Sequence, residues 1–191
     1  MSGHIWNIVR TKGLEEYFIS VWIDHSDEEE VARRLGTETI SRSDFPSAML
    51  SYPFGVGDEP EEALWVGRHG PQWTHILQIS GNYAAHPAVH ASLTRDGERL
   101  LFMCVTEVEG IEDLVLVENT QRTDDIHAFN HTPTQPGGLF ARNMAGLSFD
   151  GPSGAQEDAY LTVIGRITGM PLTEEWFDRR HLLCRVPLGI W

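Results

Sequence analysis

The stretch from Trp73 to Val105 constrains the fold of this chain more than any other. Its sequence, WTHILQISGNYAAHPAVHASLTRDGERLLFMCV, begins and ends with runs rich in aromatic, aliphatic and β-branched residues. Such runs are typical of β-strands. Between them, Gly81-Asn82 has turn chemistry, Pro87 suits the first position of a helix, and Asp96-Gly97 turns the chain again. The stretch therefore predicts a strand, a short helix over about Pro87–Thr94, a turn and a second strand.

A strand followed by a helix is also expected near the start of the chain. The run YFISVWID, Tyr17–Asp24, is aromatic and β-branched. Ser26 or Asp27 then suits the cap of a helix that continues to Leu35, and Gly36 ends it. The acidic residues at the start of this helix complement its positive end, so their first role is structural.

Three strands form the predicted centre of the chain, and the first of them is the second strand of the Trp73–Val105 stretch. They are expected at Glu98–Val108, Leu114–Asn119 and Ile126–Asn130, with turns at Glu109-Gly110 and Thr123-Asp124. Connections this short join neighbouring antiparallel strands. The region therefore predicts a three-stranded meander.

From Pro136 onward the pattern becomes helical, with helices expected at Leu139–Leu147, Ala155–Gly169 and Thr173–Arg180. Together the elements predict an α+β fold. Its sheet is expected to be mixed, mainly antiparallel, of about five strands, covered by helices on at least one face, with a helical C-terminal third. Because both halves contribute strands, we expect residues 1–191 to form a single α+β domain.

The segment Thr37–Glu62 is rich in proline and glycine and is expected to be a long loop, with a short helix near Phe45–Leu50. A loop of this length in a compact domain is either functional or mobile. It ends in an acidic patch that is a candidate partner contact, consisting of Asp58, Glu59, Glu61 and Glu62.

The charge balance excludes some classes of partner. There are 28 acidic residues against 14 basic ones, which gives a formal net charge of −14. Nucleic acids and anionic membranes attract basic surfaces, so we expect no binding to either. A basic protein would be steered toward this chain. The alternative is that the acidity serves only solubility.

Cysteine usage and apolar patterning indicate the compartment. Cys104 lies in the apolar run LLFMCV and is expected to be a buried thiol, and Cys184 is distant in sequence. Two such cysteines make no disulfide framework, which favours a reducing cytoplasm. The N-terminus has no apolar core of a signal peptide, and no run of about 18 apolar residues is present.

Two histidine pairs have the same spacing, but neither pattern predicts a metal site. Pro87 holds His86 extended, so His86 and His90 do not lie one turn apart on a continuous helix. His127 and His131 lie in strand-like sequence, where residues four apart are separated by about 13 Å. A metal would require histidines from distant segments to converge, so we expect no metal and no cofactor.

Nucleotide and nucleophile motifs are also missing. Neither G-x-G-x-x-G nor a P-loop occurs, and Gly151–Gly154 lacks the context of a nucleophile elbow.

One polar constellation remains as a candidate ligand site. Asn82, Tyr83 and His86 follow the Trp73 strand and precede a helix start, which is a common ligand position. The other side chains that we expect to approach it from neighbouring segments are Trp22, Arg68 and His69. The alternative is a polar turn in which His86 caps the helix.

Three phrases of the chain resemble one family. They are YFISVWIDHSDEEEVARRLG, the Trp73–Val105 stretch, and MAGLSFDGPSGAQEDAYLTVIGRITGMPLTEEWFD. They resemble the start, middle and tail of the uncharacterised actinobacterial domain-of-unknown-function 6461 family. The resemblance covers roughly two thirds of the chain. It implies no catalytic residues, and the Thr37–Glu62 segment departs from its shorter connector.

Two functions are compatible with these observations. The first is a small acidic cytosolic interaction or regulatory module that binds a basic protein partner, for example an immunity-type or inhibitor-type protein. The second is a small-molecule-binding protein or a metal-independent enzyme, with a pocket around Asn82, Tyr83 and His86 and His86 as acid/base. Acidic residues around an apolar patch would favour the first function. A deep pocket holding His86 beside a carboxylate would favour the second.

Overall fold

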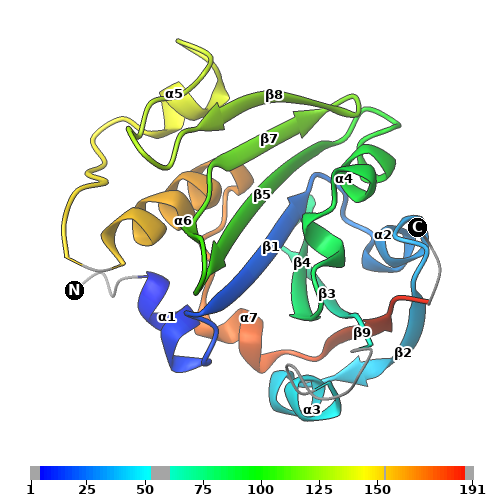
Figure 1. Ribbon diagram of the computed structural model, residues 1–191. Coiled ribbons are helices and arrows are strands. Elements are labelled where there is room, and N and C mark those ends of the chain that lie inside the picture. Colours follow the sequence, from blue (N-terminus) through cyan, green and yellow to red (C-terminus); the bar gives the residue numbers. More distant parts are fainter. Residues whose placement is uncertain (1–4, 53–60, 153, 188–191) are drawn as a thin grey trace.

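One antiparallel β-sheet runs through the computed structural model, which describes residues 5–52, 61–152 and 154–187 (Figure 1). Eight of its strands follow the order β2-β9-β3-β4-β1-β5-β7-β8, and β6 pairs with β5. The strands are β1 (Tyr17–Ile23), β2 (Glu38–Ser43), β3 (Ala63–His69), β4 (Trp73–Ser80), β5 (Arg99–Thr106), β6 (Gly110–Ile111), β7 (Leu114–Glu118), β8 (Gln121–Ile126) and β9 (His181–Arg185).

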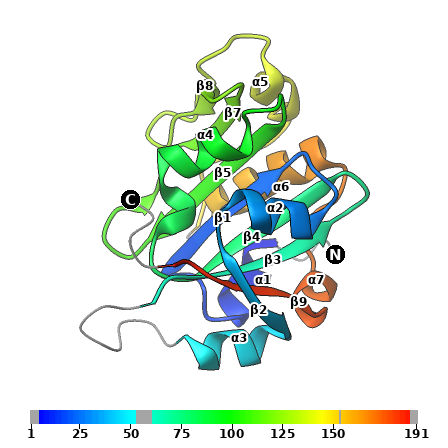
Figure 2. The same ribbon diagram turned by 90° about the vertical axis from the view of Figure 1, so that its right-hand side faces the viewer.

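Helices cover both faces of this sheet (Figures 1 and 2). The helices are α1 (Ile5–Thr11), α2 (Glu28–Arg34), α3 (Phe45–Ser51), the 3₁₀ helix η1 (Tyr83–Ala85), α4 (Pro87–Leu93), α5 (Leu139–Asn143), α6 (Ala155–Thr168) and α7 (Glu174–Asp178). Side chains of α1, α3, α5, α6 and α7 pack on one face, and those of α2, η1 and α4 pack on the other. The described chain is thus a helix–sheet–helix sandwich. None of its helices has the length and apolar character needed to span a bilayer.

Strand β1 shows why the sheet lies at the centre. Phe18 and Trp22 face the first core, whereas Ile19, Val21 and Ile23 face the second. A strand covered on both faces has an almost continuous apolar sequence, and YFISVWI fits that rule. Full burial of each large apolar side chain contributes roughly 1.5–3 kcal/mol relative to exposure.

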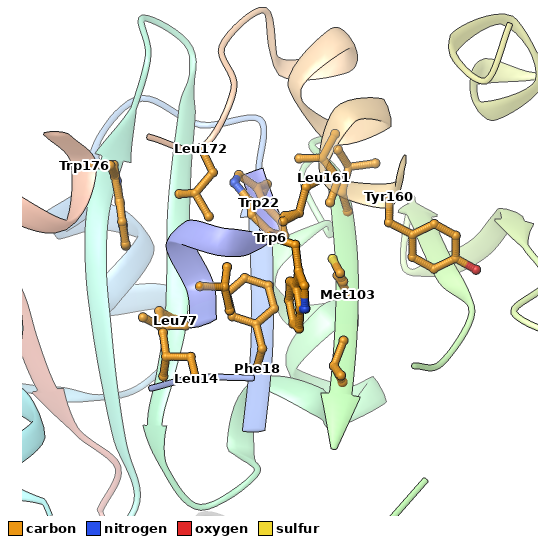
Figure 3. Close-up of a cluster of buried hydrophobic side chains, with 14 of the residues drawn as sticks. Trp6, Leu14, Phe18, Trp22, Leu77, Met103, Tyr160, Leu161, Leu172 and Trp176 are labelled. Carbon is orange, nitrogen blue, oxygen red and sulfur yellow. The ribbon is translucent and has the colours of Figure 1, made fainter. Parts of the chain in front are cut away.

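The first core is rich in tryptophan (Figure 3). Trp6 of α1 meets Phe18 edge-on, with ring centroids 5.7 Å apart. Leu161 of α6 and Leu172 pack into the same cluster, so the C-terminal helices are held to the sheet by apolar contact.

The predicted helix cap and the predicted burial of Cys104 are confirmed. Asp27 is the N-cap of α2, and its carboxylate accepts the backbone N–H groups of Glu29 and Glu30. Cys104 and Cys184 are both buried and unbridged. Burial raises the pKa of each thiol.

The sheet is larger than predicted and is not mixed. The described strands number nine rather than about five, and every described pair is antiparallel. The additional strands include β2, which lies within the expected Thr37–Glu62 loop, and β3 directly after it. The short helix expected in that loop is present as α3.

The C-terminal third is only partly helical. Helices α5, α6 and α7 lie within the predicted helical region, but α5 and α7 have only five residues each. The chain then forms β9, which inserts between β2 and β3. The reason is apolar pairing: Leu182 and Leu183 lie opposite Val66 and Trp65 of β3.

The last strand of the meander is shifted toward the N-terminus. A strand was expected at Ile126–Asn130, but β8 is Gln121–Ile126. Asn119 and Thr120 have φ values of 50° and 67°, which are the left-handed values that a tight two-residue hairpin requires. The turn therefore comes before the Thr123-Asp124 pair that the sequence favoured.

Candidate binding pocket

A pocket of about 460 Å³ lies between the helix pair η1–α4 and the β5–β7–β8 part of the sheet. Its floor is apolar and includes Phe102, Val115 and Val117. Phe102 and Val115 are direct cross-strand partners, so the register of β5 and β7 places them side by side. Ala85 and Pro87 form part of the wall. The pocket is therefore an apolar recess over the second core.

His90 supplies an aromatic wall of the pocket. It lies in the last turn of α4, and its Nε2 is 2.8 Å from the carbonyl oxygen of Ala84. Its ring centroid is 4.8 Å from that of Phe102. Burial lowers the pKa of His90, so its imidazole stays neutral at pH 7 and adds no positive charge to the pocket.

Two glutamates on the hairpin between β5 and β7 form an acidic rim. Glu109 and Glu112 flank the two-residue strand β6 and both line the pocket. Within the described part of the chain, neither forms an ion pair with a basic side chain. Glu112 also hydrogen-bonds the thiol of Cys104, which adds to the effect of burial in raising the pKa of that thiol.

Asp113 and Arg122 also line the pocket, and they form an ion pair. The guanidinium of Arg122 lies 2.8 Å from Asp113 and 2.9 Å from Asp125. Burial raises the pKa of Asp113, but the Ala128 N–H and the Arg122 guanidinium outweigh it and lower the pKa overall. The lining thus has three carboxylates and one guanidinium, and that guanidinium is already held by two aspartates.

The same network contains a set of potential metal ligands. One ligand atom each from Asp113, Asp125 and His127 lie within 4.8 Å of one another. The Arg122 guanidinium forms ion pairs with both Asp113 and Asp125. The Thr134 hydroxyl donates a hydrogen bond of 2.6 Å to Asp125. A cation would have to compete with this guanidinium, which already offsets part of the negative charge of the two aspartates.

The paired histidines of the sequence have separate surroundings. His127 follows β8 and lies near Asp113 and Asp125, whereas His131 stacks on Phe149 with ring centroids 5.3 Å apart. The expectation of strand-like structure here is wrong, because the His131 N–H donates to the His127 carbonyl in a tight turn. Of the two carboxylates that approach His127, Asp125 lies two residues earlier on β8, and Asp113 comes from the segment before β7.

The turn that was the candidate ligand site is satisfied by internal contacts. The carboxylate of Glu62 accepts the backbone N–H groups of Asn82 at 2.9 Å and Tyr83 at 2.6 Å. The Tyr83 hydroxyl donates to the Leu35 carbonyl at 2.6 Å. His86 is the N-cap of α4, and its Nδ1 accepts the Ala88 N–H. The turn lies beside the pocket, since its neighbours Ala85 and Pro87 line it.

Trp22, Arg68 and His69 do not approach this turn, contrary to expectation. In the sheet, His69 pairs with Trp73 at the start of β4, and Trp22 pairs with His75. The turn follows the other end of β4, roughly 20 Å away at 3.3 Å per residue. The antiparallel register therefore separates the two groups.

Trp22 and His69 belong instead to a buried aromatic cluster. Trp22 stacks on His75 with ring centroids 4.3 Å apart, and the His75 Nε2 lies 3.1 Å from the Ser20 hydroxyl. This serine–histidine pair is fully buried, so a substrate has no access to it. Arg68 binds the backbone carbonyls of Gly70 and Pro71.

The predicted acidic patch is only partly described. Asp58 and Glu59 lie outside the described residues, and Glu61 is exposed. The carboxylate of Glu62 accepts hydrogen bonds from the backbone N–H groups of Asn82 and Tyr83, so it stabilises the turn.

Sequence reasoning missed the pocket itself because its residues come from five separate elements, η1, α4, β5, β7 and β8, and from the turns between the strands. One weak signal was the acidic hairpin sequence EVEGIED between two apolar strands.

Comparison with protein-family models, with curated proteins and with solved structures finds no match to this chain.

Proposed function

We propose that the protein is an acidic binding module that takes up a basic segment of a partner protein at this pocket. One observation carries the proposal: an apolar floor is bordered by Glu109 and Glu112, whose charges are not paired with basic side chains in the described chain. Acidic groups around an apolar recess are complementary to a segment that carries both positive charge and apolar surface.

Two exposed hydrophobic residues next to the rim support protein docking. Val108, which precedes Glu109, is 93% exposed, and Phe129 is 97% exposed. Phe129 follows Ala128, whose N–H donates to the carboxylate of Asp113 in the pocket rim. Large apolar side chains held out in solvent are typical anchors of protein interfaces. We call Val108, Glu109, Glu112, Asp113 and Phe129 the docking surface.

The net charge of −14 supports the same proposal, because it disfavours nucleic acids and attracts basic partners. An immunity-type or inhibitor-type role in the cytoplasm is one version of it. Membership of the domain-of-unknown-function 6461 family is likewise proposed on the resemblance alone.

A small-molecule ligand is the second candidate, and the pocket volume of about 460 Å³ favours it. Pockets of roughly 300–1,000 Å³ are typical of small-ligand sites. Its centre would be the wall formed by α4 rather than Asn82, Tyr83 and His86. The Asn82 backbone N–H, the Tyr83 hydroxyl and the His86 Nδ1 already make contacts within the fold.

A peptide array tests the proposed function. The probes are 15-residue peptides that vary independently in net charge and aromatic content. We expect the protein to retain basic peptides with apolar residues, and the variant Glu109→Lys/Glu112→Lys to lose them through charge repulsion. Binding would be read by fluorescence of the labelled protein.

The control variant is Asp150→Lys/Glu174→Lys, which changes the net charge equally at two exposed sites that do not line the pocket. It should retain most peptide binding, and circular dichroism should show both variants folded. If no basic peptide is retained, or if the two variants bind alike, the proposal is wrong.

A further inference from the structure

We infer that the pocket is a receptor for one basic side chain, with its apolar stem on Phe102, Val115 and Val117 and its cationic head between Glu109 and Glu112. This inference deepens the proposed function and rests on it for the source of the side chain, which is the partner protein. The anchor residue of that partner would be an arginine or a lysine.

The floor of the pocket suits a methylene stem. Phe102, Val115 and Val117 are 6%, 8% and 5% exposed, so they are core residues that keep an accessible edge at the pocket. Ala85 and Pro87 add apolar surface to the facing wall. Arginine and lysine side chains readily bury their stems along such surfaces while their charged heads stay near polar groups.

The rim suits a cationic head. Of its three carboxylates, Asp113 is engaged by Arg122 and by the Ala128 N–H at 2.8 Å. Glu109 and Glu112 have no such cation among the described residues. A neutral apolar ligand would remove water from these two carboxylates without replacing it, so a cation is favoured.

The aromatic walls favour a planar cation. The rings of Phe102 and His90 border the pocket. The ring of Phe102 carries no charge, and burial lowers the pKa of His90, which keeps its imidazole neutral. A guanidinium can stack on such a ring and bind a carboxylate with two hydrogen bonds, whereas an ammonium is a compact point charge. We therefore expect arginine to bind more tightly than lysine.

An anionic ligand fits the same walls poorly. Arg122 is the only cationic residue that lines the described pocket, and two aspartates hold it. An anion would displace one of these aspartates or approach the two glutamates, and both are unfavourable.

A titration followed by NMR tests the inference on the whole protein. The probes are the N-acetyl amides of arginine, lysine, citrulline and norleucine, and the readout is the methyl signals of Val115 and Val117. Citrulline has nearly the shape of arginine without its charge. We expect the arginine probe to shift these methyl signals. The affinity of the citrulline probe should be lower by at least about tenfold.

The matched variants keep the shape of the glutamates. Glu109→Gln/Glu112→Gln should abolish the preference for arginine over citrulline, and Asp150→Asn/Glu174→Gln should preserve it. Equal binding of citrulline and arginine, or an unchanged preference in Glu109→Gln/Glu112→Gln, overturns the inference. Absence of any shift at Val115 and Val117 with all four probes also overturns it.

The two proposals fail in different ways. If the arginine probe binds but no peptide on the array is retained, the proposed partner is wrong and the receptor for a cation stands. If peptides are retained and replacing their arginines with citrulline has no effect, the protein-binding function stands and this inference is wrong.

Discussion

At the scale of single residues, the most unusual feature is a set of histidines in the core. His75 is fully buried, with its ring between Trp22 at 4.3 Å and Trp176 at 4.2 Å between centroids. His181 also stacks on Trp176, and its Nε2 lies 2.9 Å from the Trp176 carbonyl. The Nδ1 atoms of His69 and His75 are buried without a hydrogen-bond partner in the described chain. Each protonation there would place a second N–H in a site that offers it no acceptor.

These histidines should make the fold sensitive to mild acid. Burial lowers the pKa of His69, His75, His90 and His181, whereas a histidine in the unfolded chain has a pKa of about 6.5. Below that pH the unfolded state binds more protons than the folded state, so the free energy of unfolding falls as pH falls. Each histidine contributes up to about 1.4 kcal/mol per pH unit.

Urea unfolding between pH 7.5 and 5.5 measures this dependence. Carboxylates of lowered pKa, such as Glu30 and Asp44, act in the same direction but only at more acidic pH, so the window isolates the histidines. The variant His69→Gln can still donate to the Met170 carbonyl and should show a shallower slope. A free energy of unfolding that is constant over this window would contradict the assignment.

At the scale of the elements, β3 depends on a glycine. Gly67 lies where the imidazole of His181, from neighbouring β9, covers the strand, and a Cβ at Gly67 would overlap that ring. Gly67→Ala should therefore destabilise the protein by about 1–3 kcal/mol, as overpacking does in other cores. Thermal or urea unfolding measures the loss.

A double-mutant cycle with His181→Ala shows whether the imidazole is the cause. Removing the ring makes room for the new methyl group, so Gly67→Ala should cost at least about 1 kcal/mol less in the His181→Ala background. Additive losses would mean that Gly67 is required for another reason.

The elements also show what local sequence can predict. β1, β4, β5 and β7 are buried and rich in β-branched and aromatic residues, so pattern alone located them. β2, with the sequence ETISRS, is almost entirely exposed at the edge of the sheet and lacks that pattern. Its strand conformation comes from pairing with β9, which is more than a hundred residues away in sequence. Such pairing is not encoded locally.

The pocket escaped prediction for the same reason. Its floor consists of ordinary strand residues, Phe102 and Val115, and its acidic rim is an ordinary hairpin turn. Only the register of β5 with β7 and the position of α4 bring them together. By contrast, the Asn82–His86 turn was conspicuous in sequence because turns and helix caps need polar residues, and its polar groups serve the fold.

At the scale of the whole molecule, the proposed function assigns the acidic surface and the pocket to different steps of binding. The net charge of −14 sets a long-range field, which changes the rate of encounter with a basic partner. We expect the pocket to act at contact, where it would change the rate of dissociation. Substitutions at the two kinds of site should therefore be separable kinetically.

Ionic strength tests this division. The screening length falls from about 10 Å at 0.1 M salt to about 3 Å at 1 M, so the association rate of a basic array peptide should fall steeply as salt rises. Asp150→Lys/Glu174→Lys should lower the association rate at low salt and leave dissociation nearly unchanged. Glu109→Gln/Glu112→Gln, which removes charge at the pocket, should in addition speed dissociation at every salt concentration. Stopped-flow fluorescence measures both rates, and duplex DNA, which we expect the acidic surface to repel, serves as the non-binding control. An association rate that is independent of salt would show that the charge of −14 does not steer the partner.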